Sequence, residues 1–192
     1  MSEAYRADHV GSFLRPAEVK EARAAFREKR LHLEQLHHIE DRAILAALER
    51  QCSVGVDVFT DGEFPRSGFQ NDLVEAVEGF VATERPAVVR IWQGPGGEPH
   101  EQGTRQVVGG PLRPVRRLTE HQMRFLQAHA PGPVKMTVPS PNQFPAISFQ
   151  SGVTEPFYPT RSALLWAIVS ILKREIAALV EDGVAYIQLD EP

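Results

Sequence analysis

The chain has 192 residues, of which 42% are hydrophobic, so it can bury the core of one domain or of one large piece of a bigger domain. Its formal net charge of −4 at pH 7 gives no basic surface, which excludes nucleic acid as an expected partner and favours small polar metabolites. The single cysteine, Cys52, excludes an internal disulfide framework, and no apolar run approaches the roughly 20 residues of a membrane span. We therefore expect a cytoplasmic protein with no membrane partner.

The first part of the chain is predicted to contain an extended segment followed by two helices. The segment "RADHVGSF" is extended, and Pro16 suits the first turn of a helix that continues over residues 17–30. Apolar residues at three- and four-residue spacing predict a second helix over residues 33–55, which Gly55 ends. The run "VDVFTDGEF" then predicts a short strand that leads into a glycine turn with two acids.

Residues 84–117 have a different composition from the rest of the chain. Two β-type runs, "AVVRIWQ" and "QVVGGPLRPVRR", flank the Gly- and Pro-rich link "GPGGEPHEQGTR". This pattern predicts a β-hairpin excursion from the domain rather than a linker between domains. "GPGGEP" lacks the lysine and the strand-to-helix context of a phosphate-binding loop.

The remaining elements alternate between helices and strands. Thr119 is suited to cap a helix that runs to about residue 130, and "GPVKMTVPSP" predicts a strand. After a loop to about residue 159, a helix over residues 160–182 ends at Gly183 and is followed by the strand "VAYIQLDEP". Strands that alternate with helices predict an α/β fold with parallel strands, either an open doubly wound sheet or a barrel.

Polar residues follow each of the four predicted strands of this alternation. In α/β barrels the active site forms at the C-terminal ends of the strands, so these residues are the candidates for a site. Each group taken alone also fits turn or helix-capping chemistry, and the repetition of the same placement favours a site. The candidates are His9, Gly11, Ser12, Asp61, Glu63, Ser140, Asn142, Gln188, Asp190 and Glu191, and we add Arg66 and Asp72, which follow the second strand.

Other chemically notable residues have simpler interpretations. His37 and His38 are adjacent on a predicted helix and point about 100° apart, so a solvated helix face is favoured over a metal site. Cys52 lies among apolar residues near a helix end, which favours packing over a role as a nucleophile.

Taken together, "RADHVGSFLRP", "VFTDGEFPRS", "KMTVPSP" and "YIQLDEP" resemble the cobalamin-independent methionine synthase family, and more closely the short, single-barrel relatives of its catalytic C-terminal domain. The resemblance implies a (β/α)₈ TIM barrel of which residues 1–192 form one partial domain, the N-terminal half, with the hairpin of about residues 84–117 as an insertion. It also implies a methyltransferase of the 5-methyltetrahydropteroyltriglutamate–homocysteine type in methionine biosynthesis, in which zinc activates the homocysteine thiolate.

The resemblance assigns roles to individual residues of the chain. Gly11 and Ser12 would bind the carboxylate of the amino-acid substrate, and Glu63 and Asp190 would hold its ammonium group. The other residues of the candidate pocket are His9, Asp61, Arg66, Asp72, Ser140 and Glu191.

Two features of the sequence depart from the family pattern. The family's zinc ligands, a His-x-Cys pair, a glutamate and a second cysteine, come from later strands, so we expect no metal ligand and no catalytic residue within these 192 residues. The tryptophan that contacts folate in full-length enzymes is absent from "TVPSPNQF". The methyl donor could therefore be methyltetrahydrofolate, a methylated corrinoid protein or another alkyl carrier.

Three interpretations of function follow from these observations. The first is the homocysteine methyltransferase, with this chain as its amino-acid-binding half and inactive on its own. The second is another enzyme on the same barrel, either a zinc-dependent alkyl-thiol transferase or lyase or a tetrapyrrole decarboxylase. The third is a non-catalytic truncated fragment, whose exposed edges would favour a homo-oligomer or pairing with a complementary half-barrel.

Overall fold

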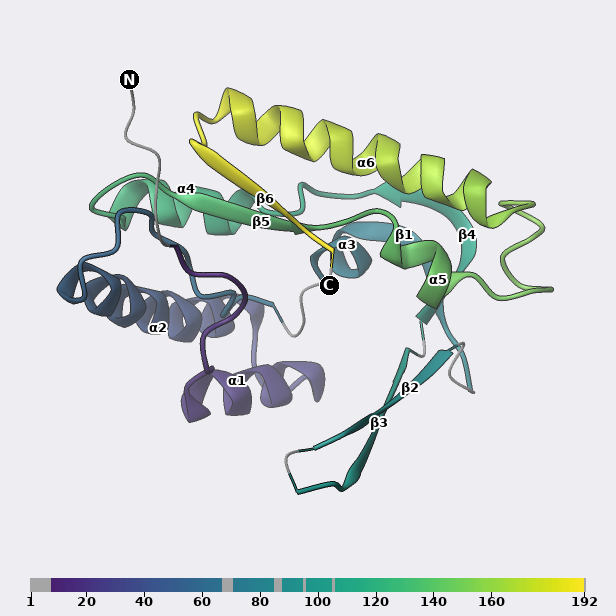
Figure 1. The fold of residues 1–192 in the computed structure, drawn as a ribbon, viewed down its shortest axis with the longest axis horizontal. Helices are drawn as coiled ribbons and strands as arrows, with labels where there is room; N and C mark the ends of the chain where they lie inside the picture. The colour runs from purple at the N-terminus through teal and green to yellow at the C-terminus, as the bar shows by residue number, and fades with distance from the viewer. Residues whose placement is uncertain (1–7, 67–70, 85–87, 95, 105, 192) are drawn as a thin grey trace. The chain divides into compact units, whose positions relative to one another are not determined.

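The structure is a computed structural model that describes residues 8–66, 71–84, 88–94, 96–104 and 106–191, and it has the predicted α/β class (Figure 1). The chain divides into two compact units. Unit 1 comprises residues 1–71, 119–138 and 178–188, and unit 2 comprises residues 72–118, 139–177 and 189–192. The prediction of a half-barrel stays a prediction.

Unit 1 contains the two N-terminal helices, α1 (Ala17–Arg27) and α2 (Leu33–Ser53), and α4 (Glu120–His129). The apolar stripe predicted for α2 is buried, including Leu36, Ile44 and Leu48. Arg23 of α1 and Glu40 of α2 form a 2.8 Å ion pair that is buried between the helices. As predicted, α2 ends just before Gly55, whose φ of +74° suits a residue without a Cβ.

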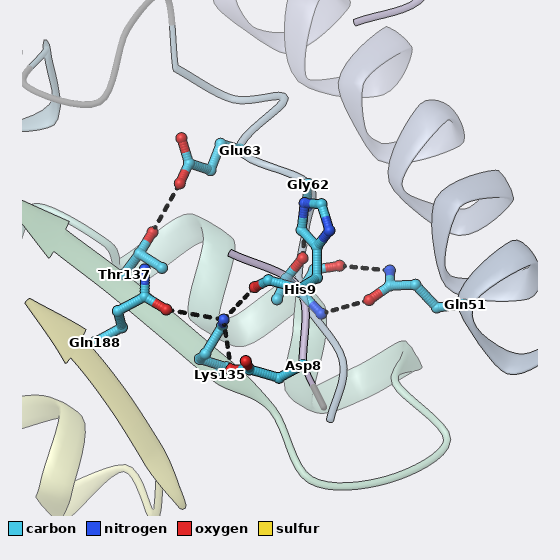
Figure 2. Close-up of polar contacts among 9 residues, drawn as sticks. Asp8, His9, Gln51, Gly62, Glu63, Lys135, Thr137 and Gln188 are labelled. Carbon is cyan, nitrogen blue, oxygen red and sulfur yellow. Dashed lines mark hydrogen bonds and ion pairs between the residues drawn. The ribbon is translucent and has the colours of Figure 1, made fainter. Parts of the chain in front are cut away.

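Three short β segments of unit 1 lie side by side. Phe59 forms an isolated parallel bridge with Val134, directly before β5 (Lys135–Pro139). The backbone N–H of Phe59 donates to the carbonyl of Pro133, and the N–H of Lys135 donates to the carbonyl of Phe59, both at 2.9 Å. Strand β5 also pairs with β6 (Tyr186–Asp190), and Figure 2 shows the two arrows pointing the same way. This arrangement agrees with the predicted parallel order, although the predicted strand before Asp61 is reduced to a single bridge.

Unit 2 is built from α3 (Asn71–Ala76), β1 (Val77–Ala82), β4 (Gln106–Pro114), α5 (Gln143–Ser148) and α6 (Arg161–Glu181), with the last residues of α6 belonging to unit 1. β1 and β4 pair antiparallel, with an irregularity next to Gly79. The buried apolar core of this unit consists of Leu73, Ala76, Val77, Val108, Leu118, Phe144, Leu164, Ile168, Ile171 and Leu172.

The hairpin prediction is correct in kind and wrong in its strand pairing. β2 (Val88–Gln93) pairs antiparallel with β3 (Pro99–Thr104), which lies inside the stretch predicted to be the link. The turn between them is closed by a 2.8 Å hydrogen bond from the N–H of Gly94 to the carbonyl of Glu98. The second predicted run became β4, which pairs with β1 instead, because the apolar faces of β1 and β4 bury Val77 and Val108 in the core of unit 2.

None of the helices in the described part of the chain combines the length and the apolarity that a membrane span requires.

Candidate functional site

The turn of residues Thr60–Arg66 carries three of the candidate residues, Asp61, Glu63 and Arg66. The side-chain amide of Gln51 in α2 accepts from the N–H of Thr60 at 3.0 Å and donates to its carbonyl at 2.9 Å. The hydroxyl of Thr60 accepts from the N–H of Gly62, and a carboxylate oxygen of Asp61 accepts from the N–H of Glu63 at 2.8 Å. These hydrogen bonds among buried groups hold the backbone of the turn in one conformation.

Gly62 is required at its position for two reasons. Its φ of +65° lies in the left-handed region that side chains disfavour. A Cβ at this position would also lie 2.5 Å from the ring of Phe13, which packs against the turn. The N–H of Phe13 donates to the carbonyl of Gly62 at 3.1 Å, so the N-terminal segment and the turn are held together.

Glu63 is the acid at the centre of the turn. It is buried, and it has a φ of +59°, which is strained for a residue with a side chain and is typical of functional sites. Its carbonyl accepts from the guanidinium of Arg15 at 2.8 Å. Its carboxylate accepts from the hydroxyl of Thr137 at 3.2 Å, as Figure 2 shows. The backbone strain is therefore balanced by contacts on both the main chain and the side chain.

Arg66 is the charged partner behind this acid. Its guanidinium is buried and donates to Thr137 of β5, to the hydroxyl at 2.6 Å and to the carbonyl at 3.1 Å. The Thr137 hydroxyl thus accepts from Arg66 and donates to Glu63, and it connects a cation to an anion through one side chain. A second guanidinium, Arg15, lies near the turn, and its burial lowers its pKa below the usual value.

The Gly11–Ser12 turn lies in the same unit as Glu63. Gly11 has a φ of +81°, and the side chain of Ser12 is exposed. His9, two residues earlier, stacks on Phe13 with 3.9 Å between ring centroids, and its Nε2 is a buried atom with no hydrogen-bond partner. His9, Gly11, Asp61, Glu63 and Arg66 thus belong to one unit, and the predicted convergence of all four strand ends stays a prediction.

Four candidates from the last two strand ends belong to unit 2, whereas Gln188 belongs to unit 1. The four are Ser140, Asn142, Asp190 and Glu191. The carbonyl of Asp190 accepts from the N–H of Ser140 at 2.8 Å and from the side chain of Gln143 at 2.9 Å. The amide of Asn142 donates to Glu191 at 2.7 Å. These contacts fix the backbone at the end of β6 against the loop after β5. Asp190 and Glu63 belong to different units, and the side chain of Asp72 lies outside the described residues.

The comparisons with known proteins give a consistent family assignment. Residues 6–192 match the model of the family described as "Cobalamin-independent synthase, Catalytic domain". The chain belongs to this family. The match covers the Gly11–Ser12 turn, the Thr60–Arg66 turn and both strands of the β5–β6 pair, so the candidate residues lie within the conserved domain type.

Individual proteins are similar to this chain over nearly its whole length. The uncharacterized protein YxjH of Bacillus subtilis is 32% identical over 97% of this chain and 48% of its own length. A protein of Mesorhizobium japonicum named 5-methyltetrahydropteroyltriglutamate–homocysteine methyltransferase is 28% identical over 95% of this chain and 22% of its own length. The structure of a putative vitamin-B12 independent methionine synthase from Listeria monocytogenes superposes with a TM-score of 0.69 at 26% identity, and covers 97% of this chain and 51% of that one. The chain thus spans about half the length of YxjH and less of the longer enzyme.

Zinc, which the resemblance to the synthase family implies, does not fit the described residues. No group of three or more His, Cys, Asp or Glu side chains in the described part of the chain could hold a metal ion. Cys52, which was predicted to be packed, is exposed near the C-terminal end of α2.

Sequence reasoning missed four residues that build this site: Gln51, Lys135, Thr137 and Arg15. The search was directed at residues directly after each strand, whereas Lys135 and Thr137 lie within β5. A signal was present in "KMTVP", where two polar residues alternate with apolar ones in a strand whose five residues are all buried. Polar side chains on one face of a fully buried strand must be paired, which points to a site.

Proposed function

We propose that this chain is the amino-acid-binding part of a methyltransferase of the cobalamin-independent methionine synthase type, with homocysteine as the methyl acceptor. The family match and the name of the Mesorhizobium relative support this reaction class. The observation that carries the proposal is the buried carboxylate of Glu63, held in a strained turn beside the Gly11–Ser12 segment.

The chemistry of an α-amino acid explains why such a turn is useful. Its ammonium group needs a fixed carboxylate, and Glu63 is held from both its carbonyl and its side chain. Its carboxylate needs N–H and O–H donors, which the backbone of Gly11 and the exposed hydroxyl of Ser12 would supply.

The thiol chemistry requires a metal that these residues do not hold. Zinc bound by other residues would keep the homocysteine sulfur as a thiolate at neutral pH. The role of this chain would be to bind the amino and carboxylate groups of the substrate and to orient its sulfur atom. We expect the 192-residue chain alone to show no methyl transfer, with methyltetrahydrofolate as the first donor to test.

The test compares two ligands that differ in one group. L-homocysteine and 4-mercaptobutyrate both carry a thiol and a carboxylate, and only homocysteine has the ammonium group. Isothermal titration should show that the wild-type chain prefers homocysteine and that Glu63→Gln removes this preference, at a loss of about 1.5–3 kcal/mol for a hydrogen bond to a charged group. Glu49→Gln is the matched control, because Glu49 is an exposed acid of α2.

Two results would contradict the proposal. Equal affinity of the wild-type chain for both ligands would exclude an ammonium pocket and would favour a zinc-dependent lyase on the same barrel. Turnover of homocysteine by the purified chain alone would show that the catalytic residues lie within it. Co-expression of the chain with the second half of YxjH tests the complete reaction, because the chain spans 48% of that relative.

A further inference from the structure

Lys135 is a buried cation that the proposed binding chemistry does not use. It is the first residue of β5, and its side chain is 0% exposed. Burial of an ammonium group costs several kcal/mol unless its charge is paired and its hydrogen bonds are made. A lysine in this environment therefore requires partners.

The partners of Lys135 account for all three of its N–H donors. Its Nζ donates to a carboxylate oxygen of Asp8 at 2.8 Å, to the carbonyl of His9, and to the side-chain oxygen of Gln188 in β6 at 2.9 Å (Figure 2). Nζ also lies 5.4 Å from the ring centroid of Tyr186, within the range of a cation–π interaction. The ammonium group thus joins the N-terminal segment to both β5 and β6.

Two of these contacts are to the segment that leads into the Gly11–Ser12 turn. Lys135 holds this segment at Asp8 and His9, and the hydrogen bond from Phe13 to Gly62 holds it on the other side of the turn. The Gly11–Ser12 turn is therefore held by contacts on both sides of it, at Asp8 and His9 before it and at Phe13 after it.

Strand β5 connects this anchor to Glu63. Lys135 and Thr137 are two residues apart, so their side chains leave the same face of the strand about 7 Å apart. Lys135 holds the segment of the Gly11–Ser12 turn, and Thr137 holds the carboxylate of Glu63. One face of β5 therefore contacts both Glu63 and the segment that leads into the Gly11–Ser12 turn.

We propose that Lys135 is a positioning residue, whose buried ammonium group holds the Asp8–His9 segment and thereby sets where the Gly11–Ser12 turn presents its donors. This role rests on the proposed function only for the identity of the ligand. The placement of the turn itself follows from the contacts of Lys135 within unit 1.

The first test reads the position of the turn without any ligand. In Lys135→Met, hydrogen exchange at the amide of Phe13 should become roughly tenfold faster or more, because its segment loses one anchor. The amide of Thr60, which is bonded to Gln51, should keep its protection in the same sample. Lys20→Met, at an exposed lysine of α1, is the matched control.

A second variant separates positioning from general stability. Lys135→Met leaves the carboxylate of Asp8 without its cation, so its melting temperature should fall. The double variant Lys135→Met/Asp8→Asn removes both charges and should recover most of the melting temperature, while the anchor to His9 stays lost. Fast exchange at Phe13 and a Kd for L-homocysteine raised roughly tenfold or more should therefore persist in the double variant.

The outcomes distinguish the two proposals. Unchanged protection of Phe13 in both variants, or a homocysteine Kd that recovers together with the melting temperature, would overturn the role of Lys135. Lost protection of Phe13 in a protein whose wild type does not bind homocysteine would support the positioning role and refute the proposed function.

Discussion

Replacement of Gly62 by alanine tests whether the Thr60–Arg66 turn depends on its contact with Phe13. The φ of +65° costs a residue with a Cβ roughly 1–2 kcal/mol. The added Cβ would lie 2.5 Å from the Phe13 ring, and such overpacking costs typically about 1–3 kcal/mol more. We therefore expect Gly62→Ala to lower the free energy of unfolding by about 2–5 kcal/mol.

Gly55→Ala is the control for the backbone contribution alone. Gly55 has a φ of +74°, and a Cβ there would have no atom within 4 Å. Urea unfolding followed by circular dichroism should show a loss of only about 1–2 kcal/mol for this variant. Equal losses for the two variants would refute the steric part of the reasoning. In the double variant Gly62→Ala/Phe13→Ala, the second change should cost less than Phe13→Ala alone, because the clash is gone.

Two further predictions concern the partners of the site. The hydrogen bond from Lys135 holds the pKa of Asp8 below its ordinary value of 3.8, although burial opposes this shift. Because the pKa of Asp8 is lower in the folded than in the unfolded state, its carboxylate stabilises the fold above about pH 4, and this stability is lost as the pH falls through the folded-state pKa. The urea midpoint of the wild type should therefore fall between pH 6 and pH 2.5, and it should fall less in Asp8→Asn. Thr137→Val removes the hydroxyl between Arg66 and Glu63 and should cost about 1–3 kcal/mol, whereas Thr137→Ser should retain most of that stability; equal urea midpoints for the two variants would show that the hydroxyl contributes nothing.

The long helices were the most predictable part of the fold. α2 and α6 were predicted to within two residues at each end, because 21 residues contain several repeats of the apolar period and both are followed by a glycine with positive φ. α3 and α5 have six residues each, too few for a period to be visible. The pairing of β1 with β4 was missed because strands that pair across a long stretch of chain leave no local signal.

Sequence reasoning selected the candidate residues that follow a strand in the chain order, and it missed those whose contacts depend on packing. Asp61 and Glu63 follow a short β segment, so the general rule for α/β folds found them. Arg66 was included in the pocket from its position after the same segment, and it does contact the partner of Glu63. Lys135 and Thr137 could not be assigned by that rule, because their role depends on which face of β5 meets the N-terminal segment.

The pairing of Gln51 with Thr60 has a consequence for how the sheet ends. The side-chain amide offers one donor and one acceptor to the two backbone groups of Thr60, so it imitates a peptide unit of a neighbouring strand. A glutamate of the same shape would offer only acceptors and a lysine only donors, and either would leave one buried backbone group of Thr60 unpaired. A helix side chain thus stands in for one residue of a strand at the point where the chain must leave the sheet and turn toward Glu63.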